Sequence, residues 1–142
     1  MRPKAFFING GAGRVLSSIP ALKKYAETHD DFVIVCEAGT DFYKGHPVLH
    51  NKCYDTWHKN LFEEHLIHRD LVSPEPYRCW HYYNQKCNLA QAFDIIINEL
   101  DEPRELQDPS IHLSKMEVVT AQNILTEIKA GTAIPPTAPI IV

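Results

Sequence analysis

Residues 6–22 carry the pattern that decides the fold: Phe6-Phe7-Ile8-Asn9-Gly10-Gly11-Ala12-Gly13-Arg14-Val15-Leu16-Ser17-Ser18-Ile19-Pro20-Ala21-Leu22. A short apolar run leads into three glycines, and apolar residues at helical spacing follow them. α/β proteins bind ligands at such junctions, because glycines let the backbone approach a ligand and the start of a helix presents free amides to an anion. The sequence therefore predicts that this turn takes part in binding.

A second strand completes a βαβ unit around this turn. Ala5–Asn9 and Phe32–Cys36 are short, apolar and rich in strand-forming residues, and the segment between them has a helical apolar stripe. Two strands joined by a helix pair in parallel, with a right-handed crossover. We expect an α/β domain with a mostly parallel, Rossmann-like sheet in three layers.

Composition excludes several classes of protein. The 142 residues suit a single domain, and 44% hydrophobic with 23% charged residues is typical of globular chains. The net charge of −4 and the lack of a basic stripe predict no nucleic-acid partner. No apolar run reaches the ~20 residues that span a bilayer, so no transmembrane segment is expected. Four cysteines without a CxxC pair predict reduced thiols and a cytoplasmic location.

The rest of the chain gives weaker patterns. We expect a loop-rich stretch over Glu37–Asp55, a short helix over Asn60–His68, a connection over Leu71–Pro76 and one long helix over Tyr77–Leu100. Within the last segment, Phe93–Ile97 alone also fits a strand. A capping box formed by Ser114 and Glu117 predicts a helix that ends near Gly131.

The domain boundary is expected near the end of the chain. Residues 1–133 form the predicted Rossmann-like domain. Residues 134–142 combine a proline-rich linker with Ile140–Val142, which suits the first strand of a further domain.

Two nucleotide-binding motifs can be compared with the glycine turn. Gly11 and Gly13 match the first two glycines of GxGxxG, and Glu37 ends the second strand, where a ribose-binding acid lies in dinucleotide folds. Against this, Leu16 replaces the third glycine. Pro20 also removes a helical hydrogen bond, so the helix is kinked or begins near Ser18. A P-loop is excluded, because no Gly-Lys-Ser/Thr exists.

The segment Gly13–Tyr25, with its Leu-x-x-x-Pro-Ala-Leu core, resembles the first βα unit of glycosyltransferase family 9, the ADP-heptose:lipopolysaccharide heptosyltransferase-like proteins. The chain is also similar to phage-encoded glycosyltransferases. The resemblance implies the N-terminal, acceptor-side domain of a GT-B enzyme. A C-terminal GT-B domain would then bind most of the nucleotide-sugar, which is a co-substrate, with no cofactor.

The resemblance implies that Asn9, Gly10, Gly11, Gly13, Arg14 and His46 contact substrate. Arg14 stands where these transferases carry an aspartate proposed as general base. An arginine stays protonated and cannot take a proton from a hydroxyl, but it can bind a phosphate or carboxylate. Glu37 and Asp41, at the carboxyl end of the second strand, are the candidate bases in its place. For His46, a turn-stabilising role is the alternative.

No metal site is predicted. His65 and His68 lie three residues apart on a possible helix, but no third ligand is evident. Cys79, His81 and Cys87 invite a zinc interpretation, yet residues 79 and 81 would point in different directions on one helix.

The leading hypothesis is transfer of a sugar from a nucleotide-sugar to a glycan or another hydroxyl acceptor. The alternatives are a non-catalytic Rossmann-like module that binds a nucleotide or glycan, and an NAD-dependent oxidoreductase.

Overall fold

The computed structural model describes residues 2–109 and 115–130. The chain divides into two compact units, Met1–Ile111 and His112–Val142. The first unit contains the sheet and its flanking helices. In the second, the described part is helix α5, Lys115–Ala130. The sequence analysis had assigned this helix to the first domain, residues 1–133.

A parallel sheet forms the centre of the first unit. Its strands are β1 (Lys4–Ile8), β2 (Phe32–Cys36), β3 (Cys53–Asp55) and β4 (Asp70–Val72), in the spatial order β3-β2-β1-β4. Lys4 of β1 is in register with Phe32 on one side and with Asp70 on the other. The expected Rossmann-like α/β fold is confirmed. Strands β3 and β4 correct the predicted loop over 37–55 and the predicted connection over 71–76.

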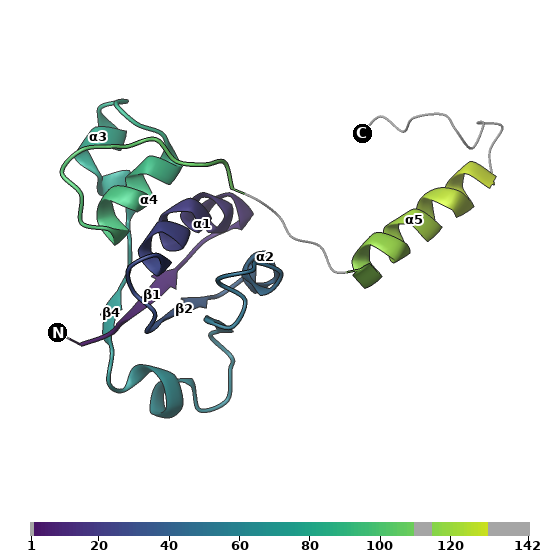
Figure 1. Ribbon diagram of the computed structural model, residues 1–142, viewed down its shortest axis with the longest axis horizontal. Helices are drawn as coiled ribbons and strands as arrows, with labels where there is room; N and C mark the ends of the chain where they lie inside the picture. The colour runs from purple at the N-terminus through teal and green to yellow at the C-terminus, as the bar shows by residue number, and fades with distance from the viewer. Residues whose placement is uncertain (1, 110–114, 131–142) are drawn as a thin grey trace. The chain divides into compact units, whose positions relative to one another are not determined.

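The core lies between the sheet and two helices, α1 (Ala12–Ala26) and α4 (Leu89–Ile97). Alternate residues of β1 and β2 enter it, because successive side chains of a strand point to opposite faces. Phe6, Tyr25 and Phe32 meet there edge to face, with Tyr25 4.9 and 5.1 Å from the two phenylalanine rings. The segment with the π-helix η1 (Phe62–Leu66) lies on the other side of the strands from α1 (Figure 1).

Helix α1 begins directly after the glycine turn. Its first residue is Ala12 and Pro20 lies within it, so a start near Ser18 is wrong. Pro20 has no amide to donate to the carbonyl one turn earlier. The Ser18 hydroxyl lies 2.6 Å from the Val15 carbonyl and 2.6 Å from the hydroxyl of Tyr43 in α2 (Thr40–Lys44). This buried pair of hydroxyls connects α1 to α2.

The long helix expected over 77–100 is wrong, and so is a strand over 93–97. The chain forms η2 (Pro76–Arg78), α3 (Trp80–Tyr83) and then α4. Gln85 breaks the helix with a φ of 59°. Asn88 then starts α4 through a capping box: its side chain accepts from the Gln91 amide at 2.8 Å, and its own amide donates to the Gln91 side chain at 2.9 Å.

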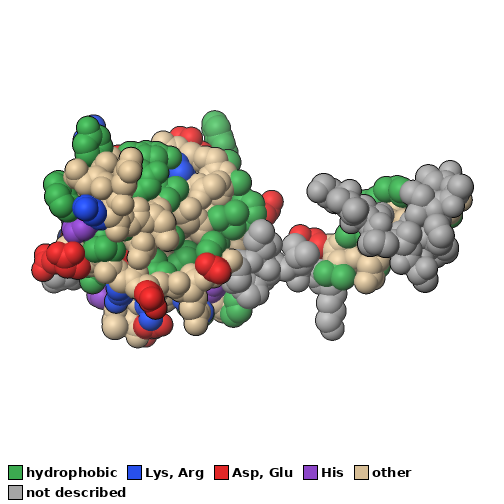
Figure 2. Space-filling model, turned by 90° about the horizontal axis from the view of Figure 1, so that it is seen from above, with side chains coloured by type: hydrophobic (Ala, Val, Ile, Leu, Met, Phe, Trp, Pro, Cys, Tyr) green, Lys and Arg blue, Asp and Glu red, His purple; other side chains and the backbone are tan. Residues whose placement is uncertain are grey.

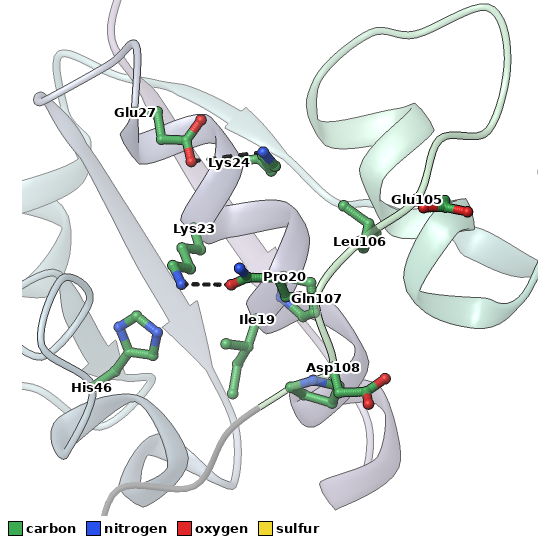
Figure 3. Close-up of a pocket in the computed structure, with 11 residues that line it drawn as sticks. Ile19, Pro20, Lys23, Lys24, Glu27, His46, Glu105, Leu106, Gln107 and Asp108 are labelled. Atoms are coloured by element: carbon green, nitrogen blue, oxygen red, sulfur yellow. Dashed lines mark hydrogen bonds and ion pairs between the residues drawn. The ribbon is translucent and has the colours of Figure 1, made fainter.

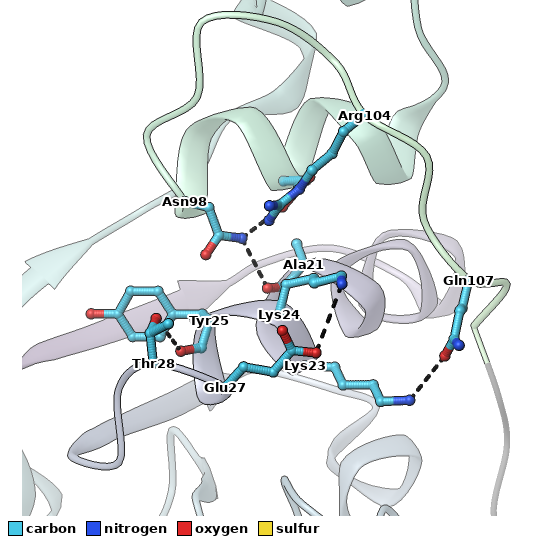
Figure 4. Close-up of polar contacts among 10 residues, drawn as sticks. Ala21, Lys23, Lys24, Tyr25, Glu27, Thr28, Asn98, Arg104 and Gln107 are labelled. Atoms are coloured by element: carbon cyan, nitrogen blue, oxygen red, sulfur yellow. Dashed lines mark hydrogen bonds and ion pairs between the residues drawn. The ribbon is translucent and has the colours of Figure 1, made fainter.

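Polar contacts attach α4 and the following segment to α1 (Figure 4). Asn98 donates to the Ala21 carbonyl at 3.1 Å, and Lys23 donates to Gln107 at 3.0 Å.

Arg104 forms a bidentate pair with the fully buried Asp94, at 2.7 and 2.9 Å. The hydrogen bonds that Arg104 donates to the Asp94 carboxylate raise the pKa of Arg104.

Charges are mixed over the face of the first unit in Figure 2, where Lys and Arg lie singly among acidic and apolar side chains. None of the helices that the structure describes is long and apolar enough to cross a membrane. Ser114, Gly131 and the predicted linker and strand over 134–142 lie outside the described residues.

Candidate functional site

The order of the strands creates a crevice between β1 and β4. The chain passes from β1 to β2 and β3 in one direction, then crosses back to place β4 on the far side of β1. Connections leave in opposite directions at such a switch point, and ligands of open α/β sheets bind outside the carboxyl ends of the strands there. A pocket of about 280 Å³ lies at this position. Its lining consists of Phe7, Asn9, Gly10, Arg14, Ser73, Pro74 and Glu75.

Gly10 is required by the geometry of this turn. Its φ of +108° is one that residues with side chains rarely adopt, and a Cβ atom there would lie 2.5 Å from Cδ of Arg14. At Gly11 and Gly13 an added Cβ would meet no atom of the described part of the chain within 4 Å. Packing within the chain therefore does not demand the last two glycines, and the space beside the start of α1 is open.

The start of α1 is electropositive. Gly11 caps the helix without a side-chain hydrogen bond, and the first turn holds no acidic residue. The amides that begin a helix have no partner one turn earlier and carry the positive end of its dipole. Arg14 adds a cation to this first turn, where a negative charge is the stabilising choice. An anionic ligand would neutralise both the positive end of the helix dipole and the charge of Arg14.

The Arg14 side chain is held in place from several directions. It donates from Nε to the Asn9 carbonyl at 2.7 Å and from Nη2 to the Pro74 carbonyl at 3.5 Å. Nη1 pairs with Oε1 of Glu75 at 3.3 Å. The guanidinium also lies over the rings of Tyr77 and Phe93, at 5.3 and 5.9 Å from their centres. Contacts with the described residues use three of its five N–H donors, which leaves two for a ligand.

Glu75 is the acidic residue of the pocket, and the sequence analysis missed it. Its Oε1 accepts from Arg14 and from the Tyr77 amide at 3.3 Å, while Oε2 has no hydrogen-bond partner within residues 2–109 and 115–130. The sequence carried a signal for Glu75, because the polar residues Ser73 and Glu75 follow the apolar pair Leu71 and Val72. That signal is useful only once β4 is known to be a strand.

The structure brings only some of the predicted site residues together. Asn9, Gly10 and Arg14 line the pocket, and Gly11 and Gly13 begin the adjacent helix. Glu37 directly follows β2, is exposed and does not line this pocket.

Asp41 and His46 also lie outside the pocket. The side chain of Asp41 is 94% exposed and lies 3.8 Å from Lys44. His46 is buried, and its Nδ1 accepts from the amides of Val48 and Leu49 at 3.1 and 3.3 Å. This geometry supports the turn-stabilising role.

His46 also lines a second pocket, of about 290 Å³, on the outer side of α1 (Figure 3). Residues of α1 form one wall of this pocket and residues 105–109 form another. Lys23 and Gln107 are hydrogen-bonded to each other across it. Its position away from the carboxyl ends of the strands makes it the weaker candidate for a ligand site.

Comparison with known proteins adds no relative: no family model, curated protein or solved structure matches this chain.

Proposed function

We propose that the first unit binds an anionic sugar ligand between β1 and β4, as the acceptor-side domain of a nucleotide-sugar-dependent glycosyltransferase. The observation that carries the proposal is the position of Arg14: a cation beside a helix start that has no side-chain cap, in the crevice at the switch point of the sheet. The resemblance of Gly13–Tyr25 to family 9 glycosyltransferases supports the choice of sugar transfer.

The binding step follows from the donors in the pocket. A phosphate or carboxylate group accepts hydrogen bonds from the two remaining Arg14 donors and from the first amides of α1. Tyr77, 51% exposed beside Arg14, offers an aromatic face to a sugar ring. Together these groups recognise one negative charge and one apolar sugar face.

The transfer step needs a base that accepts the proton of the acceptor hydroxyl. Arg14 cannot serve, since it stays protonated. Glu75 offers Oε2 in the same pocket. In the proposed reaction this carboxylate takes the hydroxyl proton while the oxygen attacks the anomeric carbon and the nucleoside diphosphate leaves. Glu37 and Asp41, which remain predictions, lie outside the pocket.

Binding is tested by NMR titration of the 142-residue chain with a hexose 1-phosphate, with nucleotide-sugars and with NAD. We expect the sugar phosphate to shift the amide signals of Ala12, Gly13 and Arg14. Arg14→Ala should weaken its binding about 10–100-fold, the cost of losing hydrogen bonds to a charged group. The matched control is Arg78→Ala, which removes an exposed arginine outside the pocket and should leave the affinity unchanged.

Two outcomes would contradict the proposal. Equal affinity in the wild type and Arg14→Ala would remove Arg14 from the site. Tighter binding of NAD than of any sugar phosphate, with shifts at the same amides, would support the oxidoreductase alternative instead.

A further inference from the structure

We infer that the connection between β3 and β4 binds a divalent transition-metal ion of the zinc class through His58, Glu64 and His65. One ligand atom from each of these residues lies within 4.8 Å of the others. The sequence analysis considered His65 with His68 and predicted no metal site. The structure instead groups His65 with Glu64, which precedes it directly, and with His58, seven residues earlier. The inference is independent of the proposed function, because none of these residues lines the Arg14 pocket.

An aromatic side chain holds the two imidazoles. Tyr54 of β3 stacks on His65, with ring centres 4.1 Å apart and planes at 26°, and meets His58 edge to face at 4.9 Å. The two histidine rings lie 5.3 Å apart. His65 is anchored most firmly, with a side chain only 24% exposed, whereas His58 and Glu64 are exposed. The cluster therefore combines one firmly held imidazole, that of His65, with two exposed side chains, those of His58 and Glu64.

The backbone brings these residues together over a short stretch of chain. Asn60 adopts a φ of 58°, which reverses the chain between His58 and Glu64, and its carbonyl accepts from the Glu64 amide at 3.0 Å. Asparagine tolerates this left-handed conformation better than most residues. The Ile67 amide then bonds the Phe62 carbonyl at 2.8 Å, the wide turn of a π-helix. Such widened turns occur frequently at functional sites.

The donor set selects the metal. Two imidazoles and one carboxylate bind zinc in catalytic sites, and a water or substrate takes the fourth position. With bond lengths of about 2.1 Å, tetrahedral ligands lie ~3.4 Å apart. Oε2 of Glu64 is already 3.8 Å from Nε2 of His65. His58 and Glu64 are exposed, so their side chains have room to rotate toward that spacing.

The other candidate ligands of the sequence do not form a comparable group. Cys79, His81 and Cys87 do not converge on one point, and His58, Glu64 and His65 form the one such group within the described residues. His81 instead pairs with Glu102, at 3.3 Å. Zinc binding by the folded chain should therefore depend on the β3–β4 connection.

The test is a zinc titration of the whole chain in competition with a chromogenic chelator, followed by a thermal melt with and without zinc. We expect one ion per chain and a rise in the melting temperature, since a ligand that binds the folded state stabilises it. His58→Ala and Glu64→Gln should each weaken binding at least about tenfold, the loss that removal of an outer-shell partner alone causes. Both positions are exposed, so these variants should fold even where His65→Ala does not.

Two matched variants serve as controls. His68→Ala and Glu63→Gln remove the same chemical groups one turn or one residue away, and both should keep the wild-type affinity. The inference is overturned if either control loses as much affinity as His58→Ala. It is also overturned if the wild type binds zinc no more tightly than the His58→Ala/Glu64→Gln double variant. Thiolate charge-transfer bands with Co²⁺ would assign the ion to cysteine and overturn it equally.

Discussion

Gly10 and Arg14 depend on each other for the shape of the pocket. With no side chain at position 10, the Arg14 side chain folds back over the turn and reaches the Asn9 carbonyl. There Arg14 also reaches Pro74 and Glu75 beyond β4, so it ties the two strand ends together. One glycine thus determines where the cation of the pocket lies.

Exchange of single glycines for alanine tests this dependence. Gly10→Ala should lower the free energy of unfolding by about 1–3 kcal/mol, the cost of a residue forced into a sparsely populated backbone conformation. Gly13→Ala, inside α1 with open space around it, should raise that free energy by about 0.4–1 kcal/mol. Urea denaturation measures both. Equal effects of the two substitutions would show that the turn places no special demand on Gly10.

Cys36 makes the free energy of unfolding depend on pH in the alkaline range. Burial, with the nearby Cys53 and Asp55 charges, raises the pKa of this thiol from an ordinary 9.0 to about 12. In the unfolded chain the thiol ionises near pH 9, whereas in the folded chain it stays neutral. Its contribution to stability is therefore complete below about pH 9 and is lost as the pH rises toward 12.

The corresponding measurement compares the wild type with Cys36→Ala by urea denaturation at about pH 8 and about pH 10.5, on either side of the unfolded thiol pKa. The advantage of the wild type over the variant should shrink at the higher pH. Parallel stability profiles for the two proteins would contradict the assignment.

Short elements carry much of this fold, and their ends are defined by specific caps. Helix α4 begins where Asn88 and Gln91 satisfy each other's amides, and the Gln91 side chain also donates to the Arg104 carbonyl at 3.0 Å. The capping box thereby joins the start of α4 to the segment whose Arg104 pairs with Asp94 in the middle of the same helix. Two unrelated contacts thus hold one short helix in place.

Loss of this cap should be measurable. Asn88→Ala should lower the free energy of unfolding by about 1 kcal/mol, within the 0.5–2 kcal/mol typical of N-caps. Asn51→Ala removes an exposed asparagine and is the control, with an expected change below about 0.5 kcal/mol. Thermal melts of the three proteins measure this difference. If the cap does not stabilise the helix, both variants will melt at the wild-type midpoint.

At the scale of the whole molecule, one core serves the sheet and its helices. Every member of that core lies before residue 98, within the unit that ends at Ile111. The segment that follows α4 is attached to α1 by the hydrogen bond from Lys23 to Gln107. The buried core described for this unit is therefore built from the unit's own residues.

Truncation of the chain after residue 111 tests this independence. We expect the shortened protein to unfold cooperatively in urea, with the same midpoint as the full chain, because the buried apolar surface is retained. A large fall in the midpoint would show that the second unit contributes to the stability of the first.

The sequence by itself determined the βαβ unit and, with it, the parallel α/β class and the glycine turn. These features depend on local patterns: an apolar run, glycines and a helical stripe within one short segment. Tertiary structure alone decided β3 and β4. Both strands are three residues long, and Leu71 of β4 is 63% exposed, so neither carries a recognisable pattern; each exists because a longer strand offers it a partner.

The same distinction holds for the sites. Sequence analysis selected Arg14 as a site residue and considered His65 without predicting a metal site, whereas Glu75 and His58 required the fold. Glu75 is 61 residues from Arg14, and it reaches the pocket only because β4 crosses back to pair with β1. His58 meets His65 because a left-handed residue and a widened turn reverse the chain between them. Sugar transfer stays a prediction, since its chemistry depends on such distant partners, and local sequence patterns do not encode them.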